Sequence, residues 1–382
     1  MSPLKCRALD FQRFGDHCWL NAASEGPLPK ISAKALKEAI DWKSKPYLLD
    51  NKFSSVCIEL KQSIGNLIHA QARDIVLGNS ASYGIHLLAN GIKWNKGDEI
   101  LVMQNDFPTD ILPWLALEKQ GVKVIQIKPK DKVLTAEELL ENITARTKLF
   151  CITHVHTFSG YTLAVSEFSK ICKKHNIIYV LNISQSAGNI PIDVVSLGAD
   201  AVVCAGYKWL LGPYGTGFCW MTPQLLESLE LNSAYWIASL SNVQLQSEDV
   251  LELKSIKGTR KFDVFGTANF FNFVPFKASI DYLLSLGIKE ICNYNQNLIN
   301  VFCDNLDLKK FKFISPVSGS ARSALVVISH LNSNKNQSVF ELLNKKHIHT
   351  AFWKGNIRIS PHVYNSDKEI LQVCKVLNSL WP

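Results

Sequence analysis

A single lysine stands between an apolar run and a glycine-rich turn. The segment AGYKWLLGPYGTGF (205–218) places Lys208 directly after GADAVVCAG (198–206), which is small and apolar. A solvated lysine is unexpected there, and burial among such residues keeps an amine partly neutral. A neutral amine can form an imine with a carbonyl compound. The position of Lys208 therefore predicts covalent chemistry, with a lysine that reaches solvent from a strand end as the alternative.

Pyridoxal phosphate is a cofactor that such a lysine can bind, and it needs further groups around it. These are a phosphate-binding turn, a flat group over the ring and a partner for the pyridine nitrogen. The segment GNSASYGIHLL (78–88) places small residues directly before a helical pattern. Free backbone N–H groups at the start of a helix bind phosphate. Taken alone, the segment is more often a plain helix cap.

A nucleotide-binding loop is a different interpretation of the glycines in GPYGTGF (212–218). A phosphate loop would end in Gly-Lys-Ser/Thr, and a dinucleotide site would place its glycines after an early strand and before a helix. Here the lysine precedes the glycines, and the apolar run FCWM (218–221) follows them. The order of residues argues against a nucleotide site.

The elements that position these residues alternate between helical patterns and short apolar runs from about residue 60 to 225. Helical patterns occupy 58–70, 82–92, 109–121, 136–143 and 166–176, and strand-like runs occupy 99–104, 122–127, 148–155, 177–183 and 200–206. Strands separated by helices imply crossover connections, so we expect an α/β fold with a mostly parallel sheet and helices on both faces. Ligands of such sheets bind beyond the carboxyl ends of the strands, where Lys208 is expected.

A second, smaller unit follows. The run NFFNFVPFKASIDYLLSLGI (269–288) predicts a helix that leads into it, and the remaining chain mixes strand-like pieces with helical patterns, which is typical of an α+β domain. We predict a large domain over residues 19–287 and a small C-terminal domain over 288–382. The N-terminal residues 1–18 are expected to pack with the small domain.

Composition narrows the classes of protein. The chain has 382 residues, of which 47% are hydrophobic and 19% charged, and this balance predicts a folded protein with a large core. Its net charge of +8 lies in short clusters without a binding motif, so no nucleic acid is expected as a partner. Ten scattered cysteines without a Cys-x-x-Cys pair predict reduced thiols and no metal site. Lacking a signal peptide or an apolar run of about 18 residues, the protein is expected in the cytoplasm and away from membranes.

The chain resembles the class V aminotransferase family of fold-type I pyridoxal-phosphate enzymes, which includes cysteine desulfurases, kynureninases and isopenicillin N epimerase-like proteins. The matching segments follow the family's order and are WLNAASEGPLP (19–29), GNSASYGIHLLANGI (78–92), NDFPTDILPW (105–114), THVHTFSG (153–160), ISQSAGNIPIDV (183–194), GYKWLLGPYGTGF (206–218), FGTANF (265–270) and IRISPHVYNS (357–366). The resemblance implies a seven-stranded, mainly parallel sheet in the large domain. It also implies a homodimer with shared active sites.

The resemblance further implies roles for single residues. Lys208 would form the internal aldimine with pyridoxal 5'-phosphate, Phe107 would stack on its ring, and Arg358 would bind the substrate carboxylate as a bidentate ion pair. The other implied residues are Ala81, Ser82, Tyr207 and Thr267 at the phosphate, Thr157 and Gln185 at the phenolic oxygen, and Asn21 and His154 at the substrate. Thr267 would come from the second subunit. Plainer alternatives are a core phenylalanine at 107, an interdomain salt bridge at Arg358 and satisfied core histidines at 154 and 156.

Two departures from the family pattern bear on the reaction. Asn182 stands where the family has an aspartate that keeps the pyridine nitrogen protonated. A neutral amide gives a pyridinium no charge stabilisation, and each pKa unit lost corresponds to about 1.4 kcal/mol. In addition, LLNKKHIHTAFWKGNIRIS (342–360) contains no cysteine where desulfurases carry their nucleophile, and Cys374 lies in a later helical pattern. A typical cysteine desulfurase is therefore not expected.

The sequence thus predicts a pyridoxal-phosphate-dependent enzyme that acts on an amino acid through Lys208 as an aminotransferase, lyase or epimerase. Asn182 leaves three possibilities open: a reaction that tolerates a weaker electron sink, a slow enzyme, or a protein that keeps the cofactor for a binding or regulatory role. Absence of the cofactor altogether is a further alternative.

Overall fold

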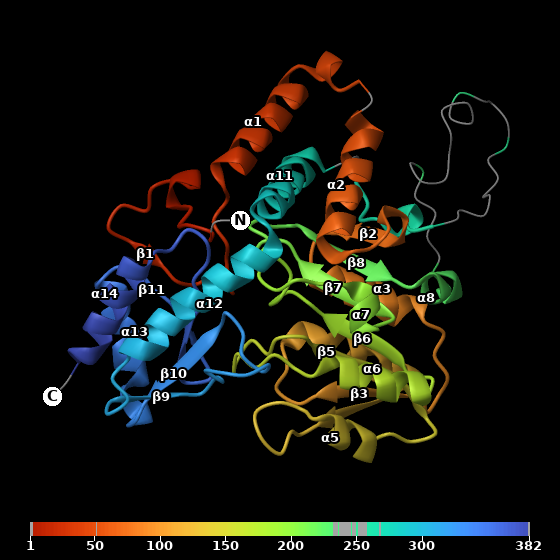
Figure 1. Cartoon of the computed structure of the whole chain (residues 1–382). Helices are drawn as coiled ribbons and strands as arrows, with labels where there is room; N and C mark the ends of the chain where they lie inside the picture. The colour runs from red at the N-terminus through yellow and green to blue at the C-terminus, as the bar shows by residue number, and fades with distance from the viewer. Residues whose placement is uncertain are drawn as a thin grey trace.

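Three sheets organise the chain. The computed structural model describes residues 3–50, 52–231, 236, 246, 250, 258–266 and 269–380 (Figure 1). Within these ranges the strands form a seven-stranded, a four-stranded and a two-stranded sheet. The seven-stranded sheet lies in the middle of the chain, and the four-stranded sheet is built from C-terminal residues (Figure 1).

The seven-stranded sheet carries the strand ends at which the candidate site is expected. Its strands are β2 (Ile75–Gly78), β3 (Glu99–Met103), β4 (Lys123–Ile127), β5 (Thr147–Thr153), β6 (Ile178–Asn182), β7 (Ala201–Ala205) and β8 (Gly217–Met221), in the spatial order β2-β8-β7-β6-β5-β3-β4. The strands β4, β3, β5, β6 and β7 pair in parallel, whereas β8 is antiparallel to both β7 and β2. The predicted α/β fold with a mainly parallel sheet is confirmed.

Helices cover both faces of this sheet (Figure 1). They are α2 (Lys52–Ile68), α3 (Ala81–Gly91), α4 (Leu112–Leu115), α5 (Ala136–Glu141), α6 (Val165–Lys174), α7 (Val194–Leu197), α8 (Pro223–Ser228) and α11 (Phe270–Leu286), and α1 (Lys30–Ser44) packs against α11. Successive strand residues point to opposite faces. In β3, Ile100 and Val102 therefore join the apolar cluster around α3, while Leu101 and Met103 join the larger cluster under α2 and α6.

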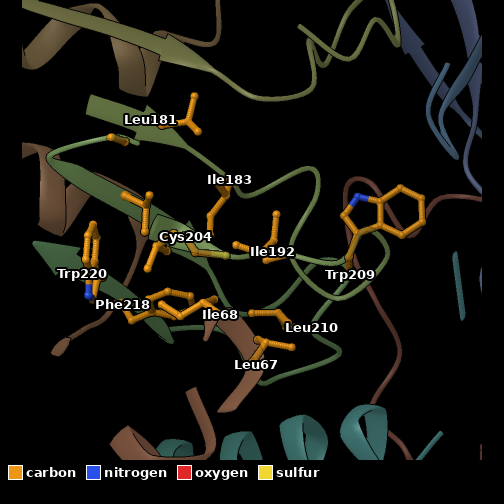
Figure 2. Packing of buried hydrophobic residues seen from close by; sticks show 14 of the residues in the cluster. Leu67, Ile68, Leu181, Ile183, Ile192, Cys204, Trp209, Leu210, Phe218 and Trp220 are labelled. Carbon is orange, nitrogen blue, oxygen red and sulfur yellow. The ribbon is translucent and has the colours of Figure 1, made fainter. Parts of the chain in front are cut away.

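The larger cluster holds the turn that carries Lys208. Figure 2 shows Leu67 and Ile68 of α2 near Phe218 of β8 and Leu210. Trp209 belongs to the same cluster and is 1% exposed. The residues on both sides of this turn are thus fixed by apolar packing, which gives Lys208 a defined position at the carboxyl end of β7.

The helix expected over 109–121 is wrong as a single element. The structure divides it into the 3₁₀ helix η4 (Pro108–Asp110), the short helix α4 (Leu112–Leu115) and the 3₁₀ helix η5 (Ala116–Gln120). Pro113 lies in the first turn of α4. Proline has no N–H to donate to a carbonyl in the preceding turn, which interrupts a helix that would run from η4 into α4.

The C-terminal part forms its own layer of helices over the four-stranded sheet (Figure 1). Its elements are α12 (Ile288–Asn305), β9 (Phe311–Phe313), β10 (Val326–His330), the 3₁₀ helix η7 (Ser333–Lys335), α13 (Asn336–Lys345), β11 (Ile348–His349), β12 (Ala351–Trp353), β13 (Asn356–Ile359) and α14 (Asp367–Asn378). Near the N-terminus, β1 (Cys18–Trp19) pairs in parallel with β11. The turn between α11 and α12 falls at Gly287, the predicted domain boundary; the division into domains stays a prediction.

All ten cysteines are free thiols, and among them Cys151, Cys204 and Cys219 are buried in strands. Across the part of the chain that the structure describes, no helix combines the length and apolar character needed to cross a membrane.

Candidate active site

Lys208 lies in a tight turn that follows β7. The Tyr207 carbonyl accepts a hydrogen bond from the Gly26 N–H at 2.8 Å, and a Cβ atom at Gly26 would collide with the Lys208 carbonyl oxygen. The Lys208 side chain is 8% exposed. Burial, assisted by the charge of Arg358, lowers its pKa to about 8. A sizeable neutral fraction of the amine is therefore present at mildly alkaline pH.

The ring of Phe107 faces this amine. Lys208 Nζ lies 5.0 Å from the centroid of the Phe107 ring. Phe107 follows β3 and precedes η4, and its ring is half-buried with Phe158 at a centroid distance of 6.4 Å. The structure thus brings the predicted lysine and the predicted stacking residue together from segments about a hundred positions apart.

Asn182 ends β6 and is held by two neighbours. Its Nδ2 donates to both carboxylate oxygens of Asp110, at 2.9 and 3.1 Å, and its Oδ1 accepts from the Ser184 N–H at 2.9 Å. Burial raises the pKa of Asp110 well above its usual range, and the charge of nearby Asp106 adds to this. Burial likewise raises the pKa of Asp106 to about 7. Two buried carboxyl groups therefore stand close to the predicted partner of the ring nitrogen.

The predicted phosphate turn is the start of α3. Ser80 is the N-cap residue, and its hydroxyl accepts a hydrogen bond from the Tyr83 N–H at 3.1 Å. Ala81 and Ser82 follow in the first turn, whose N–H groups have no partner within a helix. The Ser82 hydroxyl lies 2.9 Å from that of Thr109. A helix start with free donors and a hydroxyl group is suited to a phosphate.

Arg358 of β13 is a buried cation surrounded by neutral oxygens. It is 2% exposed, and it donates to Thr157 Oγ1 at 2.8 Å, Ser24 Oγ at 2.5 Å and Asn21 Oδ1 at 3.3 Å. Its Nε has no hydrogen-bond partner. Among the described residues no carboxylate forms an ion pair with it, and burial lowers its pKa to about 10. A buried guanidinium with this set of contacts is suited to an anionic ligand.

The remaining predicted residues link the lysine turn to the arginine. Gln185 Nε2 donates to Thr157 Oγ1 and to the Ala23 carbonyl, both at 3.0 Å, and its Oε1 accepts from Trp209 Nε1 at 2.8 Å. Thr157 therefore contacts both Gln185 and Arg358. His154 is buried with its Nδ1 2.9 Å from Ser186 Oγ, and burial lowers its pKa to about 4. His154 is consequently neutral near pH 7.

His156 is buried, with Nδ1 2.7 Å from Ser159 Oγ and Nε2 3.1 Å from the Asn105 carbonyl oxygen. Tyr207 packs with Tyr214, at a ring centroid distance of 5.5 Å, and lines a cavity of about 600 Å³ together with Glu25, Trp19 and His349. Lys208 does not line this cavity. Thr267 falls outside the described residues.

Several residues of the site are not predicted by the sequence analysis. The sequence places Asp110 only in a helix, and it assigns no site role to Asp106, Ser24 and Trp209. The pattern NDFPTD (105–110) did contain a signal, because two acidic residues flank the predicted stacking residue where a buried strand ends.

The sequence of the chain matches a known protein family. The family described as Aminotransferase class-V matches residues 20–373. The chain belongs to the class V aminotransferase family. A probable cysteine desulfurase of Methanothermobacter thermautotrophicus is 25% identical in an alignment that covers 97% of this chain and 96% of that protein. The uncharacterized aminotransferase YcbU of Bacillus subtilis is 24% identical, with 94% and 93% covered.

Solved structures share the fold of this class V chain. The cystine C–S lyase C-DES, solved with its product cysteine persulfide, has a TM-score of 0.87 at 18% identity and covers 96% of this chain and 98% of its own. A cysteine desulfurase from Thermococcus onnurineus NA1 has a TM-score of 0.87 at 21% identity, with 100% and 99% covered. The predicted fold type and membership in a family of pyridoxal-phosphate-dependent enzymes are confirmed.

The residues present fit pyridoxal phosphate. A buried amine lies over an aromatic ring, a helix start offers free N–H donors, and a buried guanidinium has an unpartnered Nε for an anionic substrate. The one unusual group is the amide of Asn182 at the predicted ring-nitrogen position.

Proposed function

We propose that this class V protein is a pyridoxal-phosphate-dependent enzyme that acts on an amino acid as an aminotransferase, lyase or epimerase. The observation that carries the proposal is the buried Lys208 amine, with its Nζ 5.0 Å from the Phe107 ring centroid. Arg358, a second buried cation whose charge lowers the pKa of Lys208, supports an amino acid as the substrate.

When bound, pyridoxal phosphate supplies a carbonyl group that condenses with amines and a ring that withdraws electrons from the bonds at an attached α-carbon. Lys208 Nζ would hold it, and Phe107 would lie against its ring. The start of α3, with Ala81 and Ser82, would bind its phosphate, and Tyr207 and the partner subunit's Thr267 would add contacts there. Thr157 Oγ1, which accepts from Gln185, would donate its hydroxyl hydrogen at the phenolic oxygen, Gln185 would lie beside it, and Asn182 would contact the ring nitrogen.

Arg358 orients the substrate. Its guanidinium donates hydrogen bonds to the neutral oxygens of Thr157, Ser24 and Asn21. A substrate carboxylate would take the place of these oxygens and form stronger, charge-assisted hydrogen bonds. Asn21, which accepts a hydrogen bond from Arg358, and His154 would be further substrate contacts. A carboxylate docked on Arg358 would lie near Lys208, whose pKa the Arg358 charge helps to lower.

Lys208 would also be the group that moves the α-proton. Its neutral Nζ would accept the proton from the substrate's α-carbon and return it to the product. Its pKa of about 8 suits both directions near neutral pH, because the amine is neither fully charged nor fully neutral.

A typical cysteine desulfurase is the activity that the proposal leaves out. Relatives of this chain carry that name, yet the stretch 342–360 before and including the substrate arginine contains no cysteine. Cys374 is buried on α14, and burial raises its pKa to about 12, so it is a poor nucleophile. Persulfide formation on an enzyme cysteine therefore has no nucleophile in the expected segment.

A second candidate is a protein that binds the cofactor without turning over an amino acid. Asn182 is the observation that favours it, because a neutral amide provides less charge stabilisation to a pyridinium than a carboxylate does. Under this alternative the role is binding or regulation.

The test is the absorbance spectrum of the purified protein with added pyridoxal 5'-phosphate, before and after borohydride reduction. We expect a visible band that reduction removes, and peptide mapping should find the reduced adduct on Lys208. The Lys208→Ala variant should lack the adduct, while Lys346→Ala, which changes an exposed lysine after α13, should form it normally. Amino acids added to the holoprotein should shift the band.

The outcomes separate the two candidates. A lysine adduct together with conversion of an amino acid supports the enzyme. An adduct with no response to any amino acid favours the binding role. Absence of any band after cofactor addition contradicts both.

A further inference from the structure

Asp110 is a buried carboxyl group whose side-chain hydrogen-bond partner, among the described residues, is Asn182. It ends η4 and is 0% exposed, and both of its oxygens accept from Asn182 Nδ2. The neighbouring carboxyl, Asp106, is instead held by backbone N–H groups, those of Phe107 at 2.7 Å and Thr153 at 3.0 Å. Of these two carboxyl groups, therefore, Asp110 is the one joined to the residue at the predicted ring-nitrogen position.

The orientation of the Asn182 amide follows from its other contact. The Ser184 N–H is only a donor, so the Asn182 atom that it contacts must be Oδ1. Nδ2 consequently points at Asp110. The carbonyl oxygen Oδ1 has two lone pairs, of which the Ser184 N–H uses one. One acceptor position on Asn182 is left for a further donor.

We propose that Asp110 is a positioning residue that supplies, through Asn182, the negative charge for a protonated ring nitrogen of pyridoxal phosphate. The amide passes on the effect because its N–H donates to the carboxylate while its carbonyl oxygen accepts from the ring N–H. The carboxylate missing at position 182 is thus retained on η4. This inference rests on the proposed function, since it requires that the site binds the cofactor.

The surroundings of Asp110 set its charge. Burial and the charge of Asp106 raise the pKa of Asp110 well above its usual range, and the hydrogen bond from Asn182 and the charge of Lys208 act in the opposite direction. Cys151, whose pKa burial raises, faces the same carboxyl as a neutral thiol. A cationic ring nitrogen would add a second positive charge near Asp110 and shift the balance toward the carboxylate.

The test uses pyridoxal 5'-phosphate labelled with ¹⁵N in the ring, bound to the full chain at neutral pH. The ring ¹⁵N chemical shift reports whether the nitrogen is protonated. We expect the pyridinium shift in the natural protein and the neutral pyridine shift in Asp110→Asn. The exchanged double variant, Asp110→Asn with Asn182→Asp, should restore the pyridinium shift because it returns a carboxylate to the ring nitrogen.

Asp106→Asn is the matched control, because it removes a buried carboxyl from the same turn that is not joined to Asn182. It should keep the pyridinium shift. Equal loss of protonation in Asp106→Asn would overturn the inference, as would a pyridinium shift that persists in Asp110→Asn. A neutral ring nitrogen in the natural protein would also overturn it while leaving the proposed function intact, whereas failure to take up the cofactor contradicts both.

A second measurement covers the case in which Asp110→Asn does not fold. An analogue with carbon in place of the ring nitrogen should bind the natural protein at least about tenfold more weakly than pyridoxal phosphate, since it loses a charge-assisted hydrogen bond. Equal binding of the two compounds would overturn the inference.

Discussion

Lys208 and Arg358 are two buried cations that influence each other. Arg358 lowers the pKa of Lys208, and neither side chain forms an ion pair among the described residues. Burying a charge without an opposite charge is unfavourable. The two buried positive charges therefore reduce the stability of the cofactor-free protein. A bound phosphate and a bound carboxylate would compensate these charges.

This reasoning predicts a pH-dependent gain in stability for Lys208→Met in the cofactor-free protein. Burial lowers the pKa of Lys208 from 10.5 to about 8, which corresponds to about 3 kcal/mol. Between these two values the unfolded chain binds more protons than the folded one, so the penalty is fully present below pH 8 and disappears as the pH rises toward 10.5. Urea unfolding should show the variant more stable at pH 7 by up to about 3 kcal/mol and the difference much smaller at about pH 10.

Lys119→Met is the control, because Lys119 is exposed on η5. Its stability should follow that of the natural protein at both pH values. A constant difference between Lys208→Met and the natural protein across this range would contradict the buried-charge explanation and point to side-chain packing.

At the scale of elements, the start of α3 combines two tasks in one turn. Ser80 caps the helix through the Tyr83 N–H, and the neighbouring N–H groups are free for a phosphate. Gly217 of β8 lies against this turn, where a Cβ atom would come within 2.8 Å of Ser80 Cα. The close strand fixes where the donors of the turn point.

We therefore predict that Ser80→Ala weakens cofactor binding in addition to destabilising the helix. Loss of the cap should lower the free energy of unfolding by about 1 kcal/mol. Ser366→Ala removes the equivalent cap of α14, far along the chain from the candidate site, and should have a similar effect on unfolding. Only Ser80→Ala should raise the dissociation constant of pyridoxal 5'-phosphate, measured by fluorescence titration. Equal affinities in the two variants would argue against phosphate binding at α3.

Most elements of the large sheet could be predicted from the sequence, because strands such as Glu99–Met103 are buried on both faces and helices separate them. Lys208 was likewise found from local pattern, and Phe107 from the resemblance to the family. The contact between Asp110 and Asn182 could not be predicted, since 72 positions separate the two residues. The helix expected over 109–121 also included Asp110, so no turn was predicted there. Proline at 113 was the local signal for that turn.

At the scale of the whole molecule, apolar side chains gather on the outer helices. Ile31 and Ile40 of α1 are 54% and 47% exposed, Tyr47 of η2 (Pro46–Leu48) is 79% exposed, and Phe271 of α11 is 45% exposed. Helices α1 and α11 lie side by side (Figure 1). Contiguous exposed apolar groups are typical of a protein interface. We propose this surface as the interface of the homodimer that the resemblance implies.

The homodimer proposal predicts that charges on this surface separate the subunits. The double variant Ile40→Lys with Tyr47→Lys should sediment as a monomer in analytical ultracentrifugation, because two buried apolar contacts become desolvated charges. Leu371→Lys places the same charge on an exposed leucine of α14 and should leave the mass unchanged.

If Thr267 reaches the phosphate of the partner subunit, the monomeric variant should also lose affinity for pyridoxal 5'-phosphate, whereas Leu371→Lys should not. A natural protein that sediments as a monomer would contradict shared active sites, and a monomeric variant with full cofactor affinity would show that each chain completes its site alone.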